Sequence, residues 1–206
     1  MKNSDIVKVF VQTPCEALRP FVKRFLVVEF STAHRHSHLP DTGLVAGFCF
    51  KGHCMLHGNA KAPQAGLTGL WDRTREAEQT GNGGIVFAAF TPTGAAALLR
   101  QPVHEFFNGI IPLDAILERS TELNRVHEQI AEAANQSRRI QAVENFLVAR
   151  SANARPDDFV SAAVSRIEDA RKVTVMLYHD KTRPSALYVP IAAASSVEEA
   201  KEKRRK

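Results

Sequence analysis

The sequence predicts an α+β fold in which an antiparallel β-barrel or sandwich is followed by a helical segment. Up to Pro92, strand-favouring residues form short runs that glycine, asparagine or proline interrupts every several positions, a pattern typical of strands and turns. After Pro92, apolar residues recur every three or four positions, which is the period of an amphipathic helix. We therefore expect a β-rich domain over residues 1–92, a helical segment over 93–170, and a divergent, partly disordered basic tail over 171–206.

Short strands separated by turn-forming residues are expected in the β-rich domain. The breaks between them fall at residues 40–43, 58–59 and 81–84, where proline, glycine and asparagine gather. Five or more short strands at this spacing are typical of an antiparallel barrel or sandwich. The expected strands cover residues 25–30, 44–51, 55–58, 66–74 and 84–90.

The helical segment begins with two short helices, expected at 94–100 and 112–119. A longer amphipathic helix is expected at 121–134, and Ser137 is the expected N-cap of the next helix, which includes residues 140–150. The turn Asn135-Gln136 would join these two helices into an antiparallel hairpin. Asp157 or Asp158 is expected to open a last helix that ends near Ala170, with Val160, Ala163, Val164 and Ile167 on one side.

The composition is that of a soluble globular protein with reduced cysteines. The sequence lacks an apolar stretch long enough to span a membrane and an apolar signal segment, so we expect a cytoplasmic protein that does not bind membranes. Three cysteines, Cys15, Cys49 and Cys54, favour free thiols over a disulfide framework. Of the net charge of +5, the last six residues contribute +4, because the other 200 carry 22 basic and 21 acidic groups. The basic run 201–206 could bind nucleic acid through phosphate contacts, but a solvated end of the chain is the simpler interpretation.

Several short motifs follow one another in an order known from one family of bacterial regulators. Pro14, Leu18, Pro20 and Val22 stand near the start, and the sequence 39–43, with Thr42 inserted, forms a proline-aspartate-glycine turn before an apolar strand. A strand ending at Phe90 then leads through Pro92 and Gly94 into an alanine- and leucine-rich helix, and the segment 111–114 and the two last helices follow. Over roughly residues 14–170, this order resembles the N-terminal regulatory region of AraC-type transcription regulators.

The resemblance implies a cupin-like β domain that senses a small effector, a helical part that forms a homodimer, and C-terminal helix-turn-helix units that bind DNA. Only 36 residues follow Ala170, and they include Pro184 and Pro190 and no second amphipathic helix. A helix-turn-helix region is therefore not evident, and we interpret the change near Lys172 as the mark of a truncated or frame-shifted reading frame. The expected function is the regulatory domain of such a regulator, without enzymatic activity and without a cofactor.

The candidate effector pocket consists of aromatic residues on the expected strands. In a small barrel, such side chains point either into the core or into a cavity that binds a small molecule. Trp71 is the preferred wall residue, because its indole offers stacking area and one hydrogen-bond donor. The candidates are Phe48, Phe50, Trp71, Phe87 and Phe90.

The apolar stripes of the helical hairpin allow two interpretations. They pack on the β domain of the same chain, or they form a two-fold dimer interface, as the resemblance implies. The residues concerned are Leu123, Val126, Ile130, Ile140, Val143 and Leu147.

A metal site is the alternative function. On a strand, His34, His36 and His38 would share one face, with Cys49, His53, Cys54 and His57 further along the chain. This pattern suggests a small cupin-like metal-binding protein or metalloenzyme. The nearby carboxylate that such enzymes usually add is missing, because Asp41 is the only acidic residue between Glu29 and Asp72.

Overall fold

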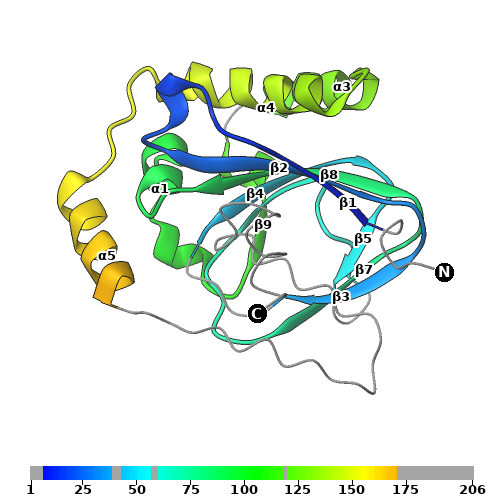
Figure 1. Ribbon diagram of the computed structural model, residues 1–206, viewed down its shortest axis with the longest axis horizontal. Helices are drawn as coiled ribbons and strands as arrows, with labels where there is room; N and C mark the ends of the chain where they lie inside the picture. The colour runs from blue at the N-terminus through cyan, green and yellow to red at the C-terminus, as the bar shows by residue number, and fades with distance from the viewer. Residues whose placement is uncertain (1–6, 39–42, 57–59, 118–119, 171–206) are drawn as a thin grey trace, which may run out of the picture.

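The computed structural model describes residues 7–38, 43–56, 60–117 and 120–170, and its strands form two antiparallel sheets that face each other. The larger sheet has the order β1-β2-β8-β4-β6-β9, and the smaller has the order β3-β7-β5. Figure 1 shows the smaller sheet beneath the larger one, with two long helices on the far side. The larger sheet consists of β1 (Val7–Gln12), β2 (Val22–Phe30), β8 (Gly83–Phe90), β4 (Val45–Lys51), β6 (Ala65–Thr68) and β9 (Ile110–Pro112); the smaller consists of β3 (His34–His38), β7 (Arg75–Gln79) and β5 (Cys54–Leu56).

The prediction of a mixed α+β fold is confirmed, and of the two predicted β architectures the structure has two sheets that face each other. Within the described part of the chain, the strands form two separate sheets and not a closed barrel. The central strands β2, β4 and β8 carry apolar residues at successive positions because both faces of the larger sheet are covered.

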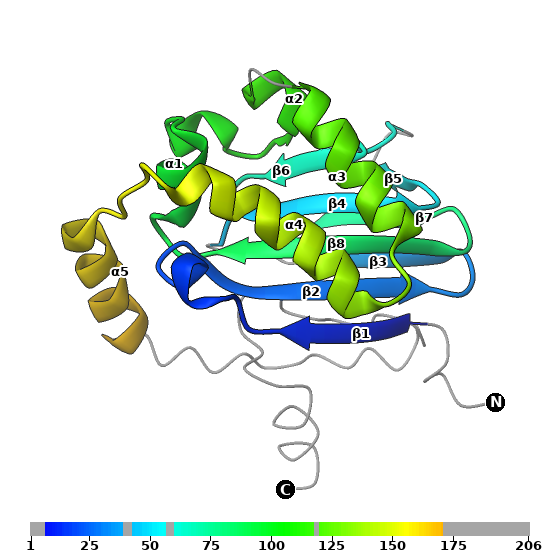
Figure 2. The ribbon, with the colours of Figure 1, turned by 90° about the horizontal axis from the view of Figure 1, so that it is seen from above.

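The helices α3 (Ser120–Glu132) and α4 (Gln136–Ser151) form an antiparallel hairpin across the outer face of the larger sheet (Figure 2). An ion pair of 2.8 Å between Arg150 and Glu122 joins the two helices. The predicted N-cap Ser137 is wrong: Asn135 caps α4, and its Oδ1 accepts a hydrogen bond of 3.0 Å from the backbone N–H of Arg138. Asparagine at this position satisfies an amide that the first helical turn leaves without a partner.

The apolar stripes of the hairpin belong to the core of a single chain. Their six side chains are between 0 and 4% exposed and pack with Phe25, Phe48 and Val86 of the sheet. Such side chains are unavailable to a second folded copy, so the interpretation as a dimer interface is corrected for Leu123, Val126, Ile130, Ile140, Val143 and Leu147.

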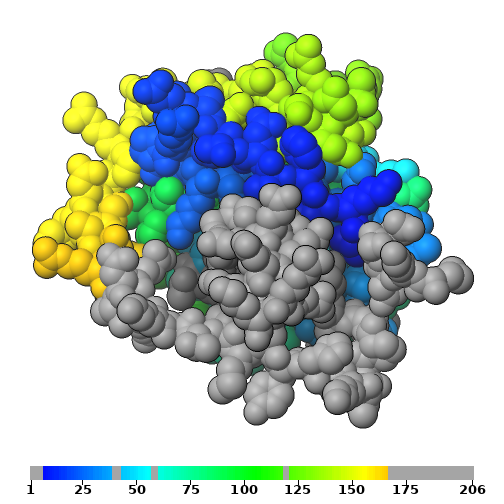
Figure 3. Space-filling model, viewed as in Figure 1, coloured from blue at the N-terminus to red at the C-terminus, as the bar shows by residue number. Residues whose placement is uncertain are grey.

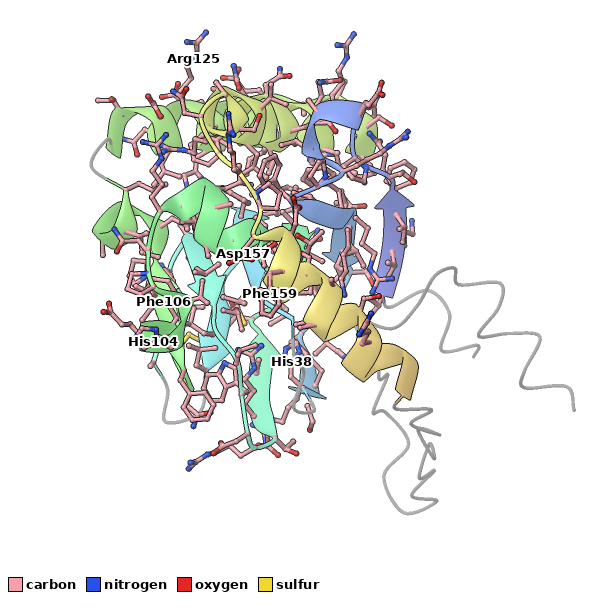
Figure 4. The ribbon with its side chains drawn as sticks, turned by 90° about the vertical axis from the view of Figure 1, so that its left-hand side faces the viewer. His38, His104, Phe106, Arg125, Asp157 and Phe159 are labelled. Carbon is pink, nitrogen blue, oxygen red and sulfur yellow. The ribbon has the colours of Figure 1, made fainter. Side chains whose placement is uncertain are left out.

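Of the remaining helices, α1 packs against α4, and α2 packs against α3 and the strands β6 and β9. The helices α1 (Gly94–Leu99) and α2 (Leu113–Ile116) are within the predicted ranges and pack against the core, as does the 3-10 turn Val103–Phe106 between them. The last helix, α5 (Asp158–Ala170), begins as expected, because Asp157 Oδ1 accepts a hydrogen bond from the N–H of Val160. The predicted apolar side is not buried, since Val160 is 41% exposed and Ala163 is exposed; the neighbouring Phe159 is 85% exposed (Figure 4).

Several strand predictions require correction. The strand predicted over 66–74 ends at Thr68, because Gly69 turns away and approaches Phe106 so closely that an added Cβ would lie 1.7 Å from the Phe106 carbonyl oxygen. The predicted turn at 81–84 is shorter, because β8 begins at Gly83. The list of expected strands did not include β1, β3, β7 or β9, although the metal-site alternative considered a strand at His34–His38.

Other predictions fall outside the described residues. These are the turns at 40–42 and 58–59, His57, and the whole segment 171–206 with its basic end. Among the described residues, no helix has the length and apolar character needed to cross a membrane.

Candidate functional site

A cavity of about 460 Å³ lies between the two sheets. Its walls come from both sheets and from the loops that follow β4, β5 and β6. The α3–α4 hairpin covers the opposite face of the larger sheet, and in the space-filling view it packs directly above the N-terminal strands (Figure 3). The larger sheet thus separates the helix-side core from the cavity.

The larger sheet contributes an apolar wall. Side chains alternate along a strand, so Ile85 and Phe87 of β8 face the cavity while Val86, Ala88 and Phe90 face the helices. The neighbouring strands follow the same alternation. The apolar wall includes Val9, Leu26, Val28, Val45, Ile85 and Phe87.

The smaller sheet contributes a polar wall. Along β3, His34, His36 and His38 face the cavity, as the alternation predicts for a strand. The intervening Arg35 points outward, where its guanidinium donates a hydrogen bond of 2.9 Å to the carboxylate of Glu78 on β7. Arg75 and Ala77 of β7 complete this wall.

The three histidines form a stacked row that continues from Phe30. The ring centres of His34 and His36 are 5.9 Å apart and nearly parallel, and His38 meets His36 edge-on at 4.6 Å. Burial lowers the pKa of His36, and burial together with the charges of Arg75 and His36 lowers the pKa of His38 to about 3. His36 and His38 are therefore neutral at physiological pH and act as hydrogen-bonding groups, not as cations.

Arg75 and Trp71 meet at the cavity wall. The guanidinium carbon of Arg75 lies 4.8 Å from the centre of the Trp71 ring, a cation–π contact. The indole Nε1 is buried and has no hydrogen-bond partner among the described residues. Arg75 also lies opposite His38 in the β3–β7 pairing, which explains its effect on the pKa of that histidine.

The charged side chains that line the cavity are all basic. Lys51, Lys61 and Arg75 border it, and none of its described lining residues is aspartate or glutamate. Lys61 Nζ lies 3.5 Å from His53 Nε2. Burial raises the pKa of the Cys49 thiol, and burial raises that of Cys54 to about 11, so both thiols are uncharged at neutral pH.

The structure brings three of the five predicted pocket residues to the cavity. Phe50, Trp71 and Phe87 line it. The assignment of Phe48 and Phe90 is corrected: both are buried on the helix side of the sheet, and the Phe48 ring meets Phe146 of α4 at 6.1 Å. Alternation explains the difference.

Phe50 lies at an irregularity near the end of β4. The register between β4 and β8 shifts between Cys49 and Lys51, as at a β-bulge. Phe50 consequently borders the cavity and also packs against the helix-side core, where the guanidinium carbon of Arg139 on α4 lies 4.4 Å from its ring centre. This side chain contacts both sides of the larger sheet.

The predicted metal site is not supported by the arrangement of its residues. His34, His36 and His38 share one face, but their rings stack along β3 and do not converge on one point. Among the residues that the model describes, no three histidine, cysteine, aspartate or glutamate side chains are placed to hold a metal ion.

The sequence analysis missed the basic residues of the cavity. Lys51 and Lys61 lie beside turns and Arg75 lies in a strongly charged strand, and each of these settings is typical of solvent-exposed residues. The one signal available was the alternation of β7, in which Arg75, Ala77 and Gln79 share the face opposite to Glu76 and Glu78.

Comparison with known proteins gives one family match and three solved chains with distant structural similarity, two of which are described below. Residues 11–112, just under half of the chain, match DUF6597, described as a domain of unknown function. No curated protein shows significant similarity to the chain.

The two solved structures have low scores. The structure of KdgF from Halomonas sp. is 12% identical with a TM-score of 0.34 and covers 45% of this chain and 84% of its own. The AraC-like transcriptional activator CuxR is 13% identical with a TM-score of 0.33 and covers 80% of this chain and 72% of its own. TM-scores this low do not establish a shared fold. The family match is more local: it ends at Pro112, the last residue of β9, and so spans the part of the chain that builds most of the cavity wall.

Proposed function

We propose that this chain is the small-molecule-sensing domain of an AraC-type transcription regulator. The cavity of about 460 Å³ between the sheets carries the proposal, because protein cavities of this size bind small ligands. The order of motifs from Pro14 to the last helix supports the assignment to this class of regulator.

The wall chemistry favours binding over catalysis. The thiols of Cys49 and Cys54 have raised pKa values, so neither is an activated nucleophile. The described lining residues include no carboxylate, and burial lowers the pKa values of His36 and His38, which makes their imidazoles weak general bases. We therefore propose a binding domain without enzymatic activity.

Phe50 provides a physical route from the cavity to the helices. Phe50 borders the cavity, and its ring contacts Arg139 of α4. A ligand that binds one position of Phe50 better than another would shift the position of α4. In a full-length regulator, such a shift would bias the DNA-binding units. The proposed homodimer would use surfaces other than the buried stripes of the hairpin.

Fluorescence titration with two dyes tests whether the cavity binds small molecules. The probes are 1-anilinonaphthalene-8-sulfonate and its uncharged relative N-phenyl-1-naphthylamine. We expect at least one dye to bind with a stoichiometry of one per chain. Val28→Trp, which adds an indole to the apolar wall, should abolish binding, whereas Glu76→Trp on the outer face of β7 should not.

Hydrogen exchange tests whether binding reaches the helices. The bound dye should slow amide exchange in α4 as well as in β4 and β8, and Phe50→Leu should remove the effect on α4 while binding persists. Absence of one-to-one binding of either dye, or binding that leaves α4 unchanged, would contradict the sensing proposal.

A further inference from the structure

The cavity has two chemically different walls. The larger sheet presents aliphatic and aromatic groups, among them Leu26, Val28 and Phe87. Facing them are the histidines of β3 and the guanidinium of Arg75 on β7. A molecule that fills the space between these walls has one apolar side and one polar side.

Charges on the smaller sheet are segregated by the alternation of its strands. Arg75 and Ala77 face the cavity, whereas Glu76 and Glu78 take the outer positions of β7. Glu78 pairs with Arg35 on that outer face, and Glu76 also acts on the charge of Arg35. The acidic groups of β7 are thus directed away from the cavity and its basic group toward it.

The charges of the basic residues affect the pKa values of histidines and cysteines on the cavity wall. Burial is the largest cause of the pKa shifts on the wall, and it lowers the pKa values of His36 and His38 and raises those of Cys49 and Cys54. The charge of Arg75 adds to the lowering for the two histidines and opposes the rise for Cys54, as the charge of Lys61 does for Cys49. A cation disfavours protonated histidine and favours thiolate, so these four effects of charge have one origin in a positive potential. The low exposure of the wall strengthens this potential compared with the protein surface.

From the two walls and the position of Arg75, we infer that the cavity binds an amphiphilic organic anion. The apolar body of the ligand would lie against Leu26, Val28 and Phe87, and its carboxylate or sulfonate would face Arg75. Lys61 and Lys51 at the cavity border add to the attraction. This inference rests on the proposed sensing function and specifies the chemical class of its ligand.

The neutral histidines predict a second measurable effect of anion binding, which is proton uptake. Each neutral imidazole carries one N–H that can donate to an anionic oxygen. An anion placed beside His36 and His38 favours their protonated forms and raises their pKa values. Because the pKa of His38 starts from about 3, binding of an anion at about pH 4–5 should therefore be accompanied by proton uptake, whereas binding of an uncharged relative should not.

The two dyes separate charge from shape, because they share the aromatic framework and differ by the sulfonate. We expect 1-anilinonaphthalene-8-sulfonate to bind at least tenfold more tightly than N-phenyl-1-naphthylamine, since a charge-assisted contact in a partly buried site has about this effect. In addition, 4-phenylbutanoate should displace the bound sulfonate dye at lower concentration than 4-phenylbutanamide.

Matched arginine variants identify the anion contact. Arg75→Gln should weaken binding of the sulfonate dye roughly tenfold and change binding of the uncharged dye less than twofold. Arg75→Lys should retain part of the preference for the anion. The control Arg35→Gln removes an arginine from the outer face of the same sheet and should leave both affinities unchanged. Titration calorimetry in two buffers of different ionisation enthalpy measures the proton uptake.

The outcomes distinguish this inference from the proposed function. Equal affinity for the two dyes, or unchanged binding of the sulfonate dye to Arg75→Gln, overturns the anion assignment and leaves the sensing function standing. If neither dye binds, or if Val28→Trp has no effect on binding, both the anion assignment and the sensing function fail.

Discussion

The guanidinium carbon of Arg139 lies 4.4 Å from the centre of the Phe50 ring, so a residue of helix α4 contacts a residue that borders the cavity. The two residues are far apart in the sequence: Phe50 belongs to β4 of the larger sheet, and Arg139 belongs to α4, which covers the outer face of that sheet. Arg125 of α3 and His38 of β3 mark the two sides that this contact connects (Figure 4).

Arg139→Met tests the energetic contribution of this contact. Methionine retains most of the aliphatic length but loses the cation, so the free energy of unfolding should fall by about 0.5–1 kcal/mol. Arg138→Met, at the adjacent exposed position, should have a smaller effect because the cap of α4 uses only the backbone of Arg138. Urea unfolding followed by circular dichroism measures both variants; equal losses would show that the contact with Phe50 is not stabilising.

Ile130→Ala tests the assignment of the hairpin stripes to the core of one chain. Ile130 is fully buried against the sheet, so its truncation should lower the free energy of unfolding by about 2–5 kcal/mol. Phe159→Ala, at an exposed position of α5, should change it by less than about 0.5 kcal/mol. If Ile130→Ala kept its stability but lowered the molecular mass in light scattering, the dimer interpretation would be restored.

The long apolar strands and the amphipathic helices could be predicted from the sequence, and the short or charged strands could not. β2, β4 and β8 lie close to their predicted ranges because both faces of the larger sheet are covered and each strand contains a run of successive apolar residues. β7 was missed because its inward positions hold Arg75, Ala77 and Gln79, which do not form an apolar alternation. β1 does alternate, with Val7, Val9 and Val11 at every second position, and this signal was available but not used.

Only part of the candidate site could be predicted, because the sequence shows which residues are on strands but not which face of each strand borders the cavity. Aromatic residues on strands point to a core or a cavity, and only the face of the strand decides between them. Phe87 and Phe90 lie three positions apart on β8 and so face opposite sides, but the sequence does not reveal which side holds the cavity. The role of Arg75 depends on tertiary pairing with β3, which no local pattern encodes.

His38→Gln tests the pH dependence of stability. The pKa of His38 is lowered to about 3 in the folded state, below its value in the unfolded chain. Its contribution is therefore fully present above pH 6.5 and is lost as the pH falls toward 3, because protonation favours the unfolded chain. Between pH 7 and pH 5 the wild type should lose about 1–2 kcal/mol that His38→Gln does not lose.

The measurement for His38→Gln is urea unfolding at several pH values. The control His104→Gln, at an exposed position outside the cavity, should keep the pH dependence of the wild type. Parallel stability curves for the wild type and His38→Gln would contradict the prediction.

Gly69→Ala should destabilise the protein because there is no space for a methyl group. The added Cβ would lie 1.7 Å from the carbonyl oxygen of Phe106, and backbone cannot move aside as a flexible side chain can. We expect a loss of about 2–4 kcal/mol in the free energy of unfolding. The comparison is Gly109→Ala, whose methyl group would meet the end of the Ile111 side chain at 3.2 Å and should cost less. Thermal unfolding of the two variants ranks them.

The alternation of β8 also has a consequence for how such a domain can diversify. Val86, Ala88 and Phe90 hold the helices, while their neighbours Ile85 and Phe87 face the cavity. Substitutions at the cavity positions alter the shape offered to a ligand without removing atoms from the helix-side core. A lineage of such proteins, or a designer who wants a new sensor, can therefore change what is recognised at every second residue while keeping the same folded framework.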